Sequence, residues 1–293
     1  MANETTITST TEIVNSEWIN PMIMDYAADV LVAAPHVNWI DLAGKATKVA
    51  AFPRWEKDTG EDITTEGTTS LSNVEITLTE VQVTAAQVGI KRELTEFQLA
   101  TNILGEAGMQ DFIARDGGYL LGEMIEDDIC AVFTGFNSSV GATGVDASIA
   151  NLVQVIAKAR TDKMRGQLVG VIDDQQQLDL TAAIASTSAQ LFSGGSNQTL
   201  MNSRSDGYLG EFLGMPIWYT NLTDTQNTGE DVCGGFWISA QSNAKQCAIG
   251  GVSVWTPRMA TDVDIALVTR KYAMTAAYGV GEVGDGIKLV TDA

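Results

Sequence analysis

A chain of 293 residues with 45% hydrophobic residues can bury about three quarters of its unfolded surface, which excludes a disordered chain and suits one large or two modest domains. Its 37 acidic residues outnumber 17 basic ones, and the formal net charge of −20 opposes a tight wrap around nucleic-acid phosphate. No stretch approaches the ~20 apolar residues that span a bilayer, and the N-terminus lacks the basic and apolar regions of a signal peptide, so we expect a soluble, unsecreted protein.

The first residues with a pattern form an arm. Residues 11–34 carry apolar side chains at helical spacing, but Pro21 and Pro35 break the pattern. We therefore expect a short N-terminal arm over residues 1–44.

Two strand-like segments then flank an acidic, threonine-rich stretch. Residues 45–55 resemble one strand, and residues 74–84 alternate apolar and polar side chains and continue toward Ile90. The stretch Glu56–Ser72, here called the tongue, has only Ile63 and Leu71 as large aliphatics, so it cannot bury enough apolar surface to order itself. We expect it to project from the body and to be mobile or docked on a neighbouring copy. The contact candidates at the strand end and in the tongue are Phe52, Arg54, Trp55, Glu56, Asp58, Glu61, Asp62 and Glu66.

A long helix is the next predicted element. After a short helix at residues 95–104, apolar residues recur at helical spacing from Met109 to Phe133, which gives a rod of roughly 37 Å at ~1.5 Å per residue. Gly117 and Gly118 each weaken its middle by ~1 kcal/mol relative to alanine. We therefore expect a bend or a close backbone crossing at this pair.

From residue 150 onward, helices and strands alternate. The patterns predict helices at residues 151–163, 173–185 and 242–248, strands at residues 167–172, 215–221, 235–239, 265–278 and 287–290, and a Ser/Gly/Asn-rich loop at residues 186–206. Gly279–Gly284 matches GxGxxG, but no helix follows it, so it is interpreted as a turn between the last two strands. The whole chain is predicted to be a mixed α+β protein without repeats.

No group of residues indicates catalysis or metal binding. Cys130, Cys233 and Cys247 are widely spaced, which is typical of free, buried thiols, and His36, the only histidine, has no nucleophile or ligand set at a suitable spacing. The acidic groups are interpreted as solvated faces and helix caps; they are Glu126-Asp127-Asp128, Asp173-Asp174 and Asp262/Asp264. We expect no catalytic residue, no metal and no cofactor.

Four basic residues fall within eight positions, namely Lys158, Arg160, Lys163 and Arg165. They suit a solvated helix end. They also suit a patch that meets an acidic partner surface, for which the tongue of a neighbouring copy is the obvious candidate. The sequence leaves both interpretations open.

The order of these elements resembles the tailed-phage major capsid protein of the Hong Kong 97 type. Three phrases carry the resemblance, and they are Val83–Ile90 before the long helix, Gly210–Asn221, and Arg270–Gly279 near the end. The resemblance implies an α+β fold with five parts. These are an N-terminal arm (1–44), an extended β-hairpin or E-loop with a peripheral strand (45–92), a peripheral (P) domain with the spine helix (93–149), an axial (A) α/β domain (150–260) and C-terminal strands that close the peripheral domain (261–293).

The same resemblance implies an assembly. Many copies would form hexamers and pentamers of an icosahedral virion shell around double-stranded DNA, assembled in the host cytoplasm without a membrane and without sequence-specific DNA binding. The implied partners are a portal and, because the arm is short, a separate scaffolding protein; a decoration protein is an open alternative. The loop at residues 186–206 would lie at the capsomer axis, with Ser193, Ser196, Asn197 and Arg204 as contact candidates.

Two other classes of protein remain as alternatives. An encapsulin-like compartment would enclose an enzyme cargo with the same fold. A soluble enzyme would need a convergent polar pocket, for which the sequence offers no nucleophile, base and orienting group.

Overall fold

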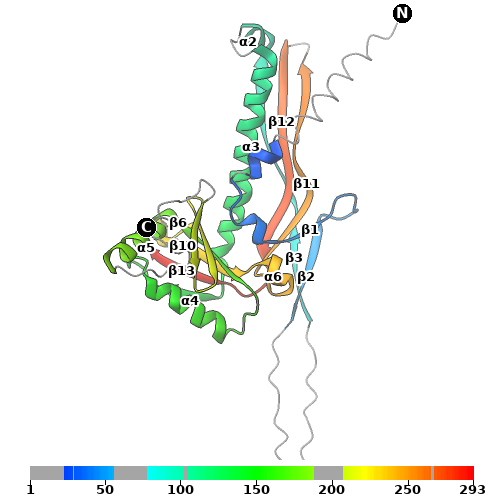
Figure 1. Cartoon of the computed structure of the whole chain (residues 1–293). Helices are drawn as coiled ribbons and strands as arrows, with labels where there is room; N and C mark the ends of the chain where they lie inside the picture. Colours follow the sequence, from blue (N-terminus) through cyan, green and yellow to red (C-terminus); the bar gives the residue numbers. More distant parts are fainter. Residues whose placement is uncertain (1–22, 29, 56–77, 102–104, 188–206, 265–266) are drawn as a thin grey trace, which may run out of the picture.

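The computed structural model describes residues 23–28, 30–55, 78–101, 105–187, 207–264 and 267–293. They form an elongated part, built on a four-stranded sheet and one long helix, and a rounder lobe built on a seven-stranded sheet (Figure 1). We call these the peripheral part and the axial lobe. In the described part of the chain, no helix is long and apolar enough to cross a membrane.

The peripheral sheet has the strand order β1-β11-β12-β4. Its centre is a long antiparallel pair, β11 (Ile249–Asp264) and β12 (Thr269–Glu282), which β4 (Ala86–Thr95) extends on one side. Strand β1 (Asn38–Asp41) joins the other side in parallel. A short helix, α2 (Glu96–Thr101), precedes the spine helix α3 (Gly105–Ala131), which runs along this sheet (Figure 1).

Helix α3 buries two adjacent rows of side chains, each with a spacing of four residues. The first row faces the sheet and contains Ile113, Gly117, Leu121, Ile125 and Ile129. The second row contains Ala114, Gly118, Gly122, Glu126 and Cys130. Its glycines meet the helical residues 23–28, so the second row is a groove for the N-terminal segment.

The close backbone crossing predicted at Gly117 and Gly118 is confirmed. A Cβ atom at Gly118 would lie 2.8 Å from the Cβ of Tyr26, and one at Gly117 would overlap the sulfur of Met274. At Gly122 a Cβ would lie 2.7 Å from the carbonyl oxygen of Ala27. The missing side chains therefore let the N-terminal segment and β12 approach the helix from two sides.

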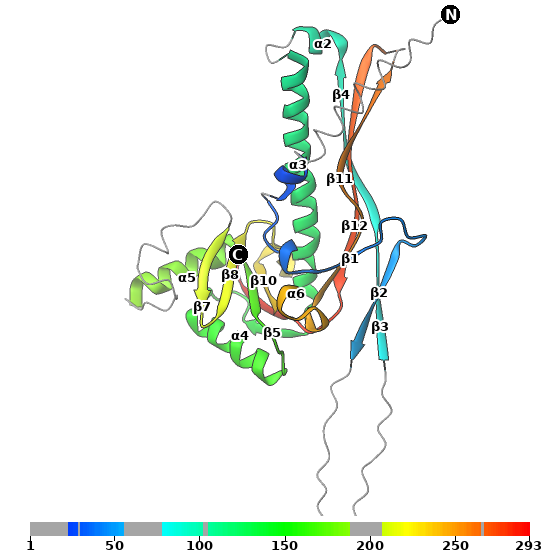
Figure 2. The ribbon, with the colours of Figure 1, turned by 45° about the vertical axis from the view of Figure 1, so that its right-hand side comes forward.

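The hairpin β2 (Val49–Trp55) and β3 (Leu78–Thr84) is antiparallel and extends away from the body (Figure 2). Its base packs on the peripheral sheet through a small core of Leu42, Ala50, Phe52, Val83, Ala85, Val252 and Val283. The chain passes from β3 into β4 through Ala85 alone, so the hairpin and the sheet share one continuous extended segment.

The axial sheet has the order β5-β13-β10-β6-β8-β7, with β9 beside β10. Its strands are β5 (Ser138–Gly141), β6 (Leu168–Asp173), β7 (Tyr208–Phe212), β8 (Met215–Thr220), β9 (Thr225–Gln226), β10 (Asp231–Ile238) and β13 (Ile287–Asp292). Every residue of β10 is buried. The core of this lobe includes Leu152 and Val155 of α4 (Ile149–Thr161) and Leu180 of α5 (Asp174–Thr187).

The C-terminal region differs from the predicted division. Strand β12 belongs to the peripheral sheet, but β13 pairs with β10 and β5 in the axial sheet, so residues 261–293 do not all close the peripheral domain. In turn, β5 belongs to the axial sheet and β11 begins at Ile249, inside the range assigned to the axial domain. Gly279 and Gly281 lie within β12 and not in a turn. A Cβ at Gly279 would overlap the carbonyl oxygen of Thr84, so glycine allows the end of β3 to approach β12 closely.

The sequence analysis did not predict strand β11, and the cause is physical. Its register shifts twice, between Ser253 and Trp255 and again between Trp255 and Arg258, so its side chains do not alternate with period two. In place of the single helix predicted at residues 242–248, the structure has the short helix α6 (Ala240–Asn243) followed by the 3-10 turn η4 (Ala244–Gln246).

Because the N-terminal segment packs in the groove on α3, a methyl group added at Gly122 should change the stability of the subunit. Gly122→Ala should lower the free energy of unfolding of the unassembled subunit by about 1–3 kcal/mol through overpacking, although helix propensity alone would raise it by ~1 kcal/mol. Glu123→Ala, at an exposed position of the same helix, is the matched control. A stabilised Gly122→Ala protein in urea unfolding would show that the N-terminal segment does not pack in this groove.

Candidate interaction surfaces

A short segment after the N-terminal helix connects the two parts of the molecule. Residues 33–39, here called the clasp, include the 3-10 turn η1 (Ala34–His36). Their backbone is held by side chains from several elements. Ala33 donates its N–H to Glu126 Oε1 at 2.7 Å, and Ala34 O accepts from Trp39 Nε1 at 2.9 Å. From the axial side, Trp237 Nε1 donates to His36 O at 3.1 Å and Gln241 Nε2 donates to Pro35 O at 3.1 Å.

Glu126 corrects the interpretation of residues 126–128 as a solvated face. Its side chain is fully buried, whereas Asp127 and Asp128 are exposed. Burial raises the pKa of Glu126 to about 7, against the backbone N–H groups of residues 32–34, which favour the carboxylate. Its second oxygen, Oε2, has no hydrogen-bond partner among the described residues. The Glu126 carboxyl group thus holds the clasp by the hydrogen bond from Ala33 in an otherwise apolar place.

His36 has a structural position. Its ring lies 4.5 Å from that of Trp218, and Nδ1 lies 3.1 Å from Ser239 Oγ. Burial lowers its pKa, which keeps the ring neutral at pH 7. Cys247 Sγ contacts the backbone oxygen of His36 at 3.4 Å and not its ring, so the geometry of a Cys-His nucleophile is not formed.

The three cysteines are free and buried, as predicted. Burial raises the pKa of Cys233 to about 12 and that of Cys247 to about 11, and it raises the pKa of Cys130 well above its ordinary value. These thiols stay protonated and unreactive at neutral pH. Within the described ranges, no group of three or more His, Cys, Asp or Glu residues could hold a metal ion.

The contact candidates at the hairpin have different surroundings. Phe52 is only 4% exposed and packs in the hairpin core, so it is not available to a neighbouring copy and that prediction is corrected. Phe52 lies on the buried face of β2 together with Ala50, whereas Ala51 and Pro53 on the other face are exposed. Arg54 pairs with Asp285 at 2.7 Å and is half-buried. The side chain of Trp55 and residues Glu56, Asp58, Glu61, Asp62 and Glu66 lie outside the described residues, as do Ser193, Ser196, Asn197 and Arg204.

The four clustered basic residues lie at the end of α4 and in the turn after it. Lys158 is half-buried, while Arg160, Lys163 and Arg165 are exposed, and none is joined by an ion pair to a described carboxylate. The N–H of Arg165 donates to Gln246 Oε1 at 2.7 Å, which brings η4 and the exposed Lys245 to the same place. We call Arg160, Lys163, Arg165 and Lys245 the basic patch. Lys245 could not be found from sequence because about 80 residues separate it from the others.

A third surface lies at the far end of the peripheral sheet. Here α2 and the β11–β12 turn expose four large apolar side chains, which we call the tip: Phe97 (76% exposed), Val263 (43%), Leu267 (63%) and Val268 (59%). The N–H of Glu96 donates to Val268 O at 3.0 Å, so α2 and the turn form one unit. Scattered apolar residues are ordinary on a surface, but four at one end make the tip a candidate contact surface.

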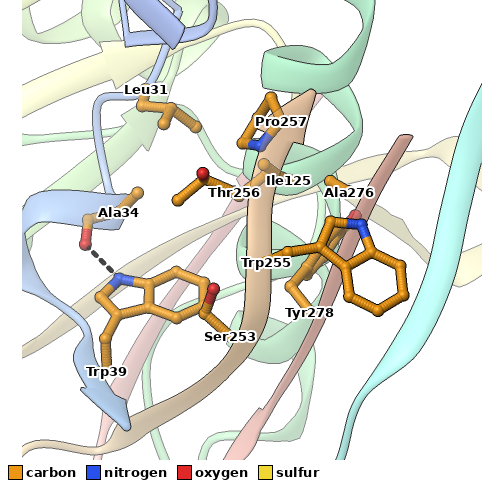
Figure 3. A pocket seen from close by; sticks show the side chains of 10 residues that line it. All are labelled: Leu31, Ala34, Trp39, Ile125, Ser253, Trp255, Thr256, Pro257, Ala276 and Tyr278. Atoms are coloured by element: carbon orange, nitrogen blue, oxygen red, sulfur yellow. Dashed lines mark hydrogen bonds between the residues drawn. The ribbon is translucent and has the colours of Figure 1, made fainter. Parts of the chain in front are cut away.

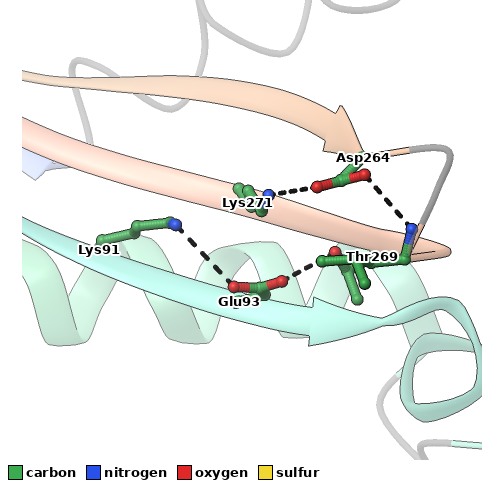
Figure 4. A network of polar contacts seen from close by, with 6 residues as sticks. Lys91, Glu93, Asp264, Thr269 and Lys271 are labelled. Atoms are coloured by element: carbon green, nitrogen blue, oxygen red, sulfur yellow. Dashed lines mark hydrogen bonds and ion pairs between the residues drawn. The ribbon is translucent and has the colours of Figure 1, made fainter.

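Polar contacts brace the strands beneath the tip (Figure 4). Lys271 pairs with Asp264 at 2.5 Å, Thr269 Oγ1 donates to Glu93 at 2.9 Å, and Lys91 lies 3.9 Å from Glu93. Arg270 pairs with Glu96 at 2.8 Å. Such exposed pairs add only ~0–1 kcal/mol each. They match three cations with three carboxylates, and Asp262, the strand partner of Lys271, adds a fourth carboxylate, so most of the charge at this end is balanced.

Glu126 predicts a pH dependence of subunit stability. Because its pKa in the folded protein is about 7 and its ordinary value is 4.5, its contribution is fully present below about pH 4.5 and is lost as the pH rises through 7. The change over this window is at most about 3 kcal/mol, at ~1.4 kcal/mol per pKa unit.

Glu126→Gln cannot titrate and serves as the reference. The free energy of unfolding of the parent protein should therefore fall relative to the variant between pH 5 and pH 8. Parallel stability curves for the two proteins in urea unfolding would show that Glu126 does not titrate in this window.

Comparison with solved structures identifies the fold. The capsid of the Helicobacter pylori bacteriophage KHP30 matches with a TM-score of 0.64 at 12% identity, over 89% of this chain and 89% of that chain. The capsid of the cyanophage P-SCSP1u gives a TM-score of 0.62 at 12% identity, over 87% and 86%. The SrpI encapsulin of Synechococcus elongatus gives 0.61 at 6% identity, over 87% and 84%. Protein-family models and curated protein sequences give no match. This chain has the α+β fold of phage capsid proteins, as its sequence predicted.

Proposed function

We propose that this chain is the major capsid protein of a tailed double-stranded DNA phage, and that it assembles into the hexamers and pentamers of an icosahedral head. The supporting observation is the extent of the structural likeness. The matched capsid chains are covered over 86% and 89% of their own length, so the likeness extends over nearly the whole shell subunit and not over a shared module.

The tip is the surface where copies meet in this proposal. Copies with a net charge of −20 repel one another across roughly a Debye length of ~10 Å. An apolar cluster on an end where most charges are balanced is a place where two such copies approach at a reduced electrostatic cost. An average subunit interface of ~1,600 Å², about 57% apolar, gains roughly 23 kcal/mol gross at 25 cal/mol/Å² before association costs. Apolar burial therefore supplies the stability, and charges select register and partner.

The acidic tongue lies across a neighbouring copy, with the basic patch as one surface that could receive it. The axial lobe faces the capsomer axis in this proposal, and the loop at residues 186–206 is the part nearest the axis. Its contact candidates with neighbouring copies are Ser193, Ser196, Asn197 and Arg204. The shell encloses double-stranded DNA without sequence-specific contacts, in line with the acidic charge. A portal and a separate scaffolding protein complete the proposed assembly in the host cytoplasm.

An encapsulin-like compartment is the second candidate. The observation that favours it is the match to an encapsulin, which covers 84% of that chain. The two functions differ in contents and not in architecture, so only the enclosed material separates them.

Electron microscopy of the purified protein tests the proposed function. We expect closed shells of uniform size, formed more readily as salt screens the like charges, and nuclease-protected DNA inside particles from the natural source. Particles that hold an enzyme in place of DNA would support the compartment. A monomer by light scattering at every protein and salt concentration would contradict both functions.

Substitution at the tip gives a second, local prediction. Leu267→Asp together with Phe97→Asp should weaken association while leaving the subunit folded, because both side chains are exposed. An interface loses ~1.5–3 kcal/mol for each large apolar side chain that it no longer buries, which is about ten- to hundredfold in affinity at each contact.

Leu178→Asp is the matched control, since that side chain is 58% exposed on α5 of the axial lobe. Sedimentation of the assembled fraction compares the variants. Equal losses from the tip and from Leu178 would show that the tip is not a specific contact.

A further inference from the structure

An apolar pocket of about 260 Å³ opens on the peripheral part (Figure 3). Five elements supply its walls. Leu31 and Ala34 come from the N-terminal segment, Trp39 from β1 and Ile125 from α3, and β11 and β12 add Ser253, Trp255, Thr256, Pro257, Ala276 and Tyr278. The double register shift in β11 lies at this point and bends the strand around the pocket. The pocket is thus a shaped feature of the fold and not a gap between loops.

A cation beside the pocket indicates what it accepts. The guanidinium of Arg258 lies 4.5 Å from the centre of the Trp255 ring. Arg258 is exposed, and no ion pair joins it to a described carboxylate. The site therefore combines an apolar well with a cation beside it.

The tongue has the complementary chemistry in a short stretch. Ile63, one of its two large aliphatics, directly follows Glu61 and Asp62. A peptide with an aliphatic side chain preceded by carboxylates fills an apolar well and places negative charge beside Arg258. The tongue's own copy is an unsuitable donor, since β2 and β3 lead the chain away from the body (Figure 2).

We propose that this pocket is the seat for the tongue of a neighbouring copy, with Ile63 in the well and Glu61 or Asp62 beside Arg258. This inference rests on the proposed shell function and names the receiving site. The basic patch has four cations, and none of its residues lines the apolar pocket. It can attract the tongue at long range, whereas the pocket fixes its register.

A disulfide-trapping experiment separates the two receiving sites. Ile63→Cys is combined with Thr256→Cys at the pocket or, in a matched protein, with Lys163→Cys in the basic patch; both receiving side chains are exposed and the native cysteines are buried. The proteins are assembled, oxidised mildly and analysed on non-reducing gels. We expect linked copies from the Thr256 pair at least tenfold above those from the Lys163 pair. Equal yields, or a higher yield from Lys163, would overturn the proposal.

A charge exchange provides an independent measurement. Arg258→Glu should lower the assembly rate at low salt at least tenfold, and Asp62→Arg together with Glu61→Arg should restore it in the same chain. Lys45→Glu, which makes the same charge change at another exposed cation, is the control. No rescue, or an equal effect of Lys45→Glu, would contradict the pairing. If shells form but neither experiment gives the expected result, the receiving site is wrong and the shell function stands; if the unmodified chain forms no shells, the proposed function itself fails.

Discussion

The two-part body depends on the apolar core that the spine helix shares with both sheets, and a hydrogen bond from Ala33 to the buried carboxyl group of Glu126 lies beside that core. It attaches the clasp to the spine helix, while Trp237 and Gln241 attach the next clasp residues to the axial lobe. A buried N–H group without a partner costs ~1–3 kcal/mol, and here the partner stands on the same helical row as the glycines that admit residues 23–28. One short segment therefore contacts both the peripheral part and the axial lobe, and the shared core joins the two parts within a single copy.

Net charge is the constraint on what that body can do next. Copies that carry −20 each cannot associate through arbitrary surfaces at low ionic strength. The structure offers two kinds of exception. At the tip, carboxylates and cations are matched under an apolar cluster, and at the pocket and the basic patch, cations remain without a described ion-pair partner. Two copies can meet through their tips, and an acidic segment of another copy can bind at the pocket or the basic patch.

Much of the fold follows from the sequence because its main elements are regular. The spine helix, the close crossing at Gly117 and Gly118, the hairpin strands and α4 each have one dominant period or an unmistakable glycine pair. The helix after β6 begins where the acidic pair predicted it, with Asp173 accepting the N–H of Gln175 at 2.7 Å. The order of these elements was enough to indicate the capsid fold.

The parts that sequence could not give depend on tertiary contact. Two register shifts remove the alternation that would reveal β11, and Lys245 joins the basic patch only through the fold. The burial of Glu126 could have been predicted, since Glu126 continues the four-residue row of Ala114, Gly118 and Gly122. Its acidic neighbours suggested a solvated face instead. Phe52 likewise lies on the buried side of its strand. The pocket needs five elements and has no counterpart in any single stretch.

The central claim is that the two-part body is already formed in the isolated subunit. Its most direct test is hydrogen exchange, measured on the isolated subunit and on the assembled protein. The amide of Ala33 should be as well protected in the isolated subunit as in the assembly, because its partner Glu126 belongs to the same chain. The amides around Phe97 and Leu267 should exchange rapidly in the subunit and slow on assembly, because these residues are exposed until a second copy covers them. Rapid exchange at Ala33 in the isolated subunit, with protection only after assembly, would show that the two-part body is made by the shell and not by the clasp.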